Sequence, residues 1–86
     1  MFDKPFLVKK VVESLHKGNF NVLQTDGAFD IVARREKETL LIKVLMNVDA
    51  FKENQAMSLR AIAYFMNSQP VVVSTKNNRE IGRAHV

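Results

Sequence analysis

The sequence predicts one α/β domain built from a helix, three strands, a second helix and a fourth strand, with a mixed four-stranded sheet flanked by the helices. Two segments repeat apolar residues at helical spacing, and four shorter segments alternate apolar and polar residues or are apolar throughout. Glycine, proline and polar residues separate these segments. With 86 residues, the chain has room for one domain and no more.

The first helix is predicted to follow the capping residue Asp3 and to end at Lys17. An aspartate can accept a hydrogen bond from the free N–H groups of the first turn, where Pro5 is also tolerated. Gly18 is expected to adopt the left-handed conformation that often follows a helix. The apolar stripe of this helix consists of Leu7, Val8, Val11, Val12 and Leu15.

Three strands are expected to follow as a meander. The first begins around Phe20 and Val22, and the turn signal Asp26-Gly27 separates it from the second strand at 28–34. On the second strand, one face is expected to carry Phe29, Ile31 and Ala33. The third strand, 39–46, has two mainly apolar faces, so we expect it to be central and covered on both sides.

The second helix is expected to start at a cap provided by Asn47 or Asp49 and to run to about Asn67. Its stripe is Phe51, Gln55, Leu59, Ile62 and Met66. The run Val71-Val72-Val73 then predicts a buried strand, which a right-handed crossover places parallel to the third strand. We expect the domain to occupy residues 1–75 and residues 76–86 to form a polar C-terminal segment. One interpretation is that this segment is the start of a further region of the protein.

Composition restricts the class of protein. The hydrophobic content of 47% argues against a disordered chain, and the absence of cysteine excludes disulfides and thiolate metal sites. No apolar run approaches the roughly 18 residues that cross a membrane, and the N-terminus has no signal-peptide layout. A cytoplasmic domain without a cofactor is therefore expected. The net charge of +4 favours anionic partners such as nucleic acid, although solubility alone also explains so small an excess.

The hairpin between the second and third strands positions two charged residues. A loop of two or of four residues, centred on 36–37, gives the same pairing: Asp30 opposite Lys43, and Val32 opposite Leu41. An aspartate and a lysine should therefore meet in the middle of the sheet. Judged from residue type alone, they form a half-buried ion pair that fixes the strand register.

This order of elements resembles the restriction-endonuclease-like fold, whose active-site motif is PD-(D/E)-x-K. The motif places an aspartate on the second strand, matched by Asp30, and acid-x-lysine on the third, where Lys43 matches the lysine. Its middle acid falls on Leu41. Because such sites need a divalent cation held by carboxylates, the resemblance implies that these three positions are vestigial. No catalytic residue and no metal site are expected.

Two glutamates on the helices are candidates to replace the missing acid, and Gln55 is a separate polar residue on the apolar stripe of the second helix. Glu13 should face solvent, because it points away from the apolar stripe of its helix, and nothing selects Glu53. Some enzymes of this superfamily carry a glutamine on the second helix near the active site, as Gln55 would be, but with a companion tyrosine where Leu59 stands here. We therefore expect Gln55 to hydrogen-bond backbone at the sheet edge.

The runs 29–35 and 40–50 resemble the N-terminal region of a group of archaeal proteins regarded as helix-turn-helix transcriptional regulators. In that group an endonuclease-like domain of unknown role precedes the DNA-binding domain. The helix-turn-helix is not within these residues, because no second and third helix follow Val73. Base-specific DNA reading is therefore expected in a region beyond Val86.

The resemblance implies a non-catalytic accessory domain of a transcriptional regulator, serving association, sensing or nonspecific DNA contact. Two alternatives stay open: a metal-dependent DNA endonuclease or junction resolvase with a displaced acidic ligand, and a protein–protein interaction module. A homodimer is a further expectation, with a sheet edge and the second helix as candidate surfaces and Tyr64 and Phe65 as exposed contact residues of that helix. The candidates for contacts to DNA phosphates are Arg34, Arg35, Lys37, Lys76, Arg79 and Arg83.

Overall fold

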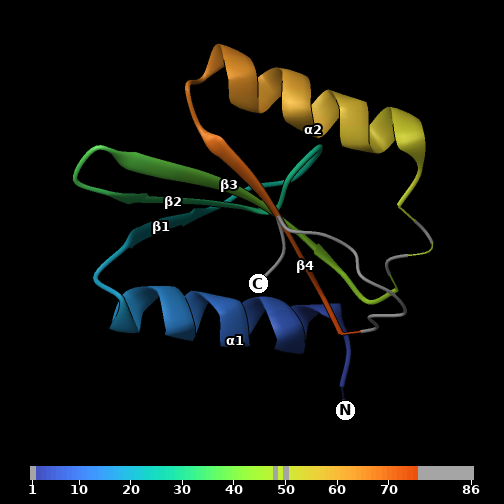
Figure 1. Cartoon of the computed structure of the whole chain (residues 1–86). Coiled ribbons are helices and arrows are strands. Elements are labelled where there is room, and N and C mark those ends of the chain that lie inside the picture. Colours follow the sequence, from blue (N-terminus) through green and yellow to red (C-terminus); the bar gives the residue numbers. More distant parts are fainter. Residues whose placement is uncertain (1, 48, 50, 76–86) are drawn as a thin grey trace.

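The computed structural model describes residues 2–47, 49 and 51–75. The elements are α1 (Lys4–Lys17), β1 (Asn21–Gln24), β2 (Ile31–Arg35), β3 (Glu38–Leu45), α2 (Glu53–Phe65) and β4 (Gln69–Ser74). The strands form a sheet in the order β1-β2-β3-β4, in which β4 is parallel to β3 and the other neighbours are antiparallel. The two helices cover opposite faces of this sheet (Figure 1). The predicted mixed α/β fold is confirmed.

Helix α1 begins as predicted and ends differently in detail. Asp3 Oδ1 accepts a hydrogen bond from the Phe6 N–H at 3.1 Å. At the other end Gly18 has φ −88°, so the expectation of a left-handed Gly18 is wrong. Its N–H still bonds the carbonyl of Ser14 at 3.1 Å, which prolongs the last turn by one residue. The reversal therefore falls on Asn19, with φ 68°, a residue type that tolerates this conformation.

The β2–β3 hairpin has the shorter of the two expected loops. Arg35 pairs with Glu38 across the two residues 36 and 37, and Val32 pairs with Leu41 as predicted. The second strand begins at Ile31, later than expected, because the chain bends at 27–28 and again at Asp30. As a consequence the assignment of Phe29 to the face of Ile31 and Ala33 is wrong, and Phe29 packs on the α2 side.

Hydrophobic side chains cover the sheet on both faces. The cluster on the α1 side contains Ile31, Ala33, Ile42, Val44, Val71 and Val73, and the predicted stripe of α1 packs against it. The cluster on the α2 side contains Leu41, Leu59 and Ala63. Strand β3 contributes to both clusters, which confirms its prediction as a central strand. Within the residues that the structure describes, neither helix is long and apolar enough to cross a membrane.

Helix α2 is shorter than predicted. It begins at Glu53 after the N-cap residue Lys52, so the expectation of a cap at Asn47 or Asp49 is wrong. The Asn47 side chain instead accepts a hydrogen bond from the Asp49 N–H at 3.0 Å, a local turn that competes with helix formation. The connection between β3 and the helix therefore takes up residues that the apolar spacing had assigned to the helix.

Candidate functional site

The Asp30 carboxylate lies at the end of the sheet, directly before β2. Its Oδ2 atom accepts a hydrogen bond from the Val44 N–H of β3 at 2.7 Å. Its Oδ1 atom lies 3.0 Å from Nζ of Lys4, and Lys43 Nζ lies 3.9 Å from Oδ2. The side chain is only 14% exposed. Both oxygens of this carboxylate are therefore engaged by the protein itself.

Lys43 lies beside Asp30, but Asp30 precedes β2 at the end of the sheet, so the expectation that the two residues meet in the middle of the sheet is wrong. The 3.9 Å between Lys43 Nζ and Asp30 Oδ2 makes a long ion pair, and Nζ also donates to the Gly27 carbonyl at 3.4 Å. Its side chain is as buried as that of Asp30. The lysine is therefore held against the loop before β2.

Lys4 is the nearer cation to Asp30, and this contact was not predicted from the sequence. This residue is the first of α1, and its side chain extends from that helix to Asp30 at the end of the sheet. Its position contained a usable signal, because Leu7 and Val8 follow three and four residues later. Residues at this spacing share one face of a helix, so Lys4 lies on the sheet-facing side of α1.

Leu41 occupies the position at which the family motif has its middle acid. The side chain is fully buried, with 0% exposure, and it packs against Leu59 and Ala63 of α2. No space between these apolar side chains is open to water at Leu41 itself. The position therefore contributes to the hydrophobic core under α2.

The donor set does not fit the divalent metal of restriction-endonuclease-like enzymes. Hard cations prefer several oxygen ligands, and magnesium sites usually combine carboxylates with water. In the described residues, no three histidine, cysteine, aspartate or glutamate side chains lie close enough to hold a metal ion. Glu13 is exposed on α1 and lies 3.7 Å from Lys10, and the exposed Glu53 lies 4.0 Å from Arg60. Neither glutamate accompanies Asp30.

Gln55 bonds backbone, but not where the sequence suggested. Its Oε1 atom accepts a hydrogen bond from the Lys52 N–H at 2.9 Å, at the start of its own helix. The side chain is exposed, whereas the expected partner was backbone at the sheet edge. The expectation of a sheet-edge partner is therefore wrong. Gln55 caps α2, because its spacing of three residues from the N-cap matches the reach of a capping-box glutamine.

Arg35 ties the hairpin to the end of α1. Its guanidinium donates to the Gly18 carbonyl at 2.7 Å and lies 3.0 Å from Glu38 Oε1. It also lies over the Phe20 ring, 4.1 Å from the centroid. These three contacts hold the guanidinium between the α1–β1 connection and the start of β3.

The other basic residues considered for DNA contact differ in accessibility. Arg34 is exposed and donates to the Thr39 hydroxyl at 3.1 Å, and Lys37 is exposed at the hairpin loop. Lys76, Arg79 and Arg83 lie outside the described residues. A role of these side chains in binding DNA stays a prediction.

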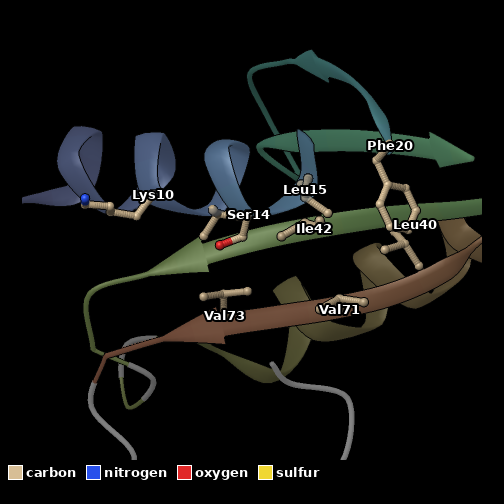
Figure 2. A pocket seen from close by; sticks show the side chains of 9 residues that line it. Lys10, Ser14, Leu15, Phe20, Leu40, Ile42, Val71 and Val73 are labelled. Carbon is tan, nitrogen blue, oxygen red and sulfur yellow. The ribbon is translucent and has the colours of Figure 1, made fainter. Parts of the chain in front are cut away.

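An apolar cleft of about 430 Å³ lies between α1 and the β3–β4 half of the sheet, and no sequence signal had indicated it. Figure 2 shows side chains of α1 along one wall and those of β4 along the other. The lining residues are Lys10, Val11, Ser14, Leu15, Phe20, Leu40, Ile42, Val71 and Val73. Because seven of these nine are apolar, the cleft offers hydrophobic surface and few of the converging polar groups that orient small ligands.

This chain is similar to a known domain family and to proteins named as transcriptional regulators. A family model described as a PD-(D/E)XK superfamily domain matches residues 4–86. A protein from Archaeoglobus fulgidus named "Putative HTH-type transcriptional regulatory protein" is 35% identical over 74 residues, which are 81% of this chain and 24% of that protein.

Similarly named proteins match from two other archaea. The protein from Picrophilus torridus is 36% identical over 75 residues, covering 83% of this chain and 24% of its own length. The protein from Thermoplasma acidophilum is 35% identical over 77 residues, covering 85% of this chain and 25% of its own length. The chain thus spans about a quarter of the length of these curated relatives.

Proposed function

The chain belongs to the PD-(D/E)XK superfamily, and from this premise we propose that it is a non-catalytic accessory domain of a DNA-binding transcriptional regulator. The names of its archaeal relatives support the regulatory part of this proposal. Those relatives are about four times longer, so sequence-specific DNA reading is assigned to chain outside this domain. A regulator acts where the DNA lies, so the proposal also places the domain in the cytoplasm.

The burial of Leu41 is the observation that supports the non-catalytic part. Metal-dependent cleavage of a phosphodiester needs carboxylates that hold the cation and activate water. Here the acid position lies in the core against α2, and the remaining Asp30 carboxylate is occupied by Val44 and two lysines. A metal ion would have to displace these partners and would gain one protein ligand.

Nonspecific contact with DNA is a secondary role that the basic surface supports. The sequence carries a net charge of +4, and Arg34 and Lys37 are exposed at the β2–β3 hairpin. Phosphate contacts of this kind weaken as salt is raised, because binding releases condensed counterions. We expect binding to a duplex at low salt that is independent of sequence. Arg34→Ala together with Lys37→Ala should weaken it and reduce the salt dependence by about two phosphate contacts.

The proposal is tested by titrating the chain with magnesium and manganese in a calorimeter and by incubating it with supercoiled and branched DNA. We expect no saturable metal binding up to millimolar concentration and no nicking. The Asp30→Ala variant serves as the control for any trace activity. Metal binding together with cleavage, both lost in Asp30→Ala, would contradict the proposal and assign a metal-dependent nuclease with a displaced ligand.

A further inference from the structure

Helix α2 carries a second apolar stripe that faces away from the sheet. Leu59 and Ala63 are its buried residues and lie against β3 and β4. On the other side Met57 is 55% exposed, Tyr64 81% and Phe65 83%. Ala61 is exposed between them. These four residues, which we call the outer stripe, follow one another at steps of four, three and one, so they share one side of the helix.

The outer stripe is uncharged. The charged residues of α2 are Glu53 and Arg60, which lie beside the stripe, four residues before and three residues after Met57, and have opposite charges 4.0 Å apart. A solvent-facing helix surface in a globular protein normally carries charged and polar residues. Figure 1 shows α2 as the outermost layer on its side of the sheet, with no described element above it. The outer stripe therefore resembles the apolar surface of a packed interface, but no described element of the chain covers it.

We propose that the outer stripe is a self-association surface, at which α2 of one chain packs antiparallel against α2 of a second copy. A twofold axis brings each residue near the equivalent residue of its partner. A surface with charges of one sign would repel itself in that arrangement, whereas this stripe is uncharged and the two charges beside it are opposite and pair with each other. The absence of net charge thus favours a second copy over a basic or acidic partner.

The stripe also has the symmetry that an antiparallel helix pair requires. Ala61 is flanked four residues before by Met57 and four residues after by Phe65. A twofold axis at Ala61 places Met57 of each copy against Phe65 of the other. The small Ala61 side chains at the crossing point allow the helices to approach to about 8 Å. The Tyr64 and Phe65 rings pack edge to face, with centroids 5.7 Å apart.

The size of the surface suits a weak dimer. A phenylalanine or tyrosine buries roughly 150–250 Å² when fully covered, so the outer stripe offers roughly 500 Å² per copy. Two copies would bury about 1,000 Å², near the lower limit for specific interfaces of about 1,200 Å². Association is therefore expected at roughly micromolar to submillimolar concentration.

This self-association rests on the proposed function, in which association is one of the roles of the domain. It is tested by a measurement that depends on neither metal nor DNA. We measure the mass of the chain by sedimentation equilibrium between about 10 and 500 µM. The mass should rise with concentration toward twice 9.8 kDa. Ala61→Arg should stay monomeric, and because its side chain is exposed its unfolding curve should match that of the native chain at concentrations where the native chain is monomeric. Lys9→Arg, on exposed α1 surface, should dimerise like the native chain.

A cysteine at the crossing point adds a test of geometry. The sequence has no cysteine, so Ala61→Cys introduces a single thiol next to its symmetry mate. With diamide as oxidant, two thiols should lose two hydrogens to it and form one intermolecular disulfide. The matched control Lys9→Cys, exposed on α1, should cross-link at least about tenfold more slowly. A native chain that stays monomeric, equal cross-linking of the two variants, or a dimer that persists in Ala61→Arg would each overturn the inference, whether or not the chain proves to be a nuclease.

Discussion

Restoring the missing acid by Leu41→Glu is predicted to unfold the domain rather than restore metal binding. Leu41 is fully buried against Leu59 and Ala63. Losing the packing of a buried leucine costs about 2–5 kcal/mol, and a buried carboxylate without a partner costs several kcal/mol more. A chain of this size is expected to have a total stability of about 4–13 kcal/mol. The substitution therefore removes most or all of the free energy of unfolding.

Urea unfolding, monitored by circular dichroism at several pH values, measures both the size of this loss in the free energy of unfolding and its pH dependence. Leu41→Met should cost less than about 1.5 kcal/mol, because it keeps an apolar side chain of similar volume. Burial raises the pKa of an introduced glutamate above its ordinary value of about 4.3, so the folded variant binds the proton more tightly than the unfolded chain. The variant should accordingly lose stability as the pH rises above about 4.3, the ordinary pKa of glutamate, and recover part of that stability at lower pH.

A different outcome would refute this reasoning. Leu41→Glu would have to fold within about 1 kcal/mol of the native chain at pH 8 and bind manganese. That result would mean that position 41 opens toward solvent and toward Asp30 in solution, and that the contact with α2 is not fixed. Leu41→Met serves as the control that separates a packing effect from a charge effect.

Three further substitutions follow from the contacts, each measured as the change in the free energy of unfolding at pH 7. Asp30→Ala should cost about 1–3 kcal/mol, because the Val44 N–H and the largely buried Lys43 lose their acceptor, whereas Asp30→Asn should cost less. Arg35→Ala should cost about 1–2 kcal/mol, and Arg35→Lys should not restore it, because an ammonium cannot reproduce the planar contacts. Gly18→Ala should be neutral or stabilise by up to about 1 kcal/mol, since φ is −88° and an added Cβ would meet its nearest atom at 3.5 Å; a loss above about 1 kcal/mol would contradict the assigned conformation.

The order of elements and the strand register could be predicted because both depend on local pattern. The hairpin tolerated either loop length and still paired Val32 with Leu41, since side chains alternate with a period of two. The buried Leu41 at the acid position followed directly from that register. The same logic failed for Phe29, because the bend at Asp30 interrupts the alternation, and bends of this kind leave no periodic signal.

The contacts of the candidate site depend on tertiary structure and were predicted less well. Lys4 approaches Asp30 only because α1 crosses the sheet so that its first turn lies where β2 begins and β3 ends. No spacing along the chain encodes that crossing angle. Gln55 illustrates the opposite case: its exposed capping role is local and readable from its distance to Lys52, but the apolar stripe suggested a buried residue. Its assignment failed because the start of the helix was placed too early.

The charges around Asp30 show what stabilises its carboxylate at the end of the sheet without a metal ion. In a metal-dependent nuclease the cation neutralises this carboxylate, whereas here two ammonium groups lie within 3.0 and 3.9 Å of it. The Val44 N–H of β3 adds a third favourable contact. Lys4 thus supplies from α1 the positive charge that a metal ion would supply from solvent. Removing Lys4 alone frees Oδ1 but adds no second carboxylate, so Lys4→Ala should still bind no metal, and it should cost at most about 1 kcal/mol because this pair is partly exposed. Metal binding by Lys4→Ala in the calorimeter would show that charge, and not the buried Leu41, excludes the cation.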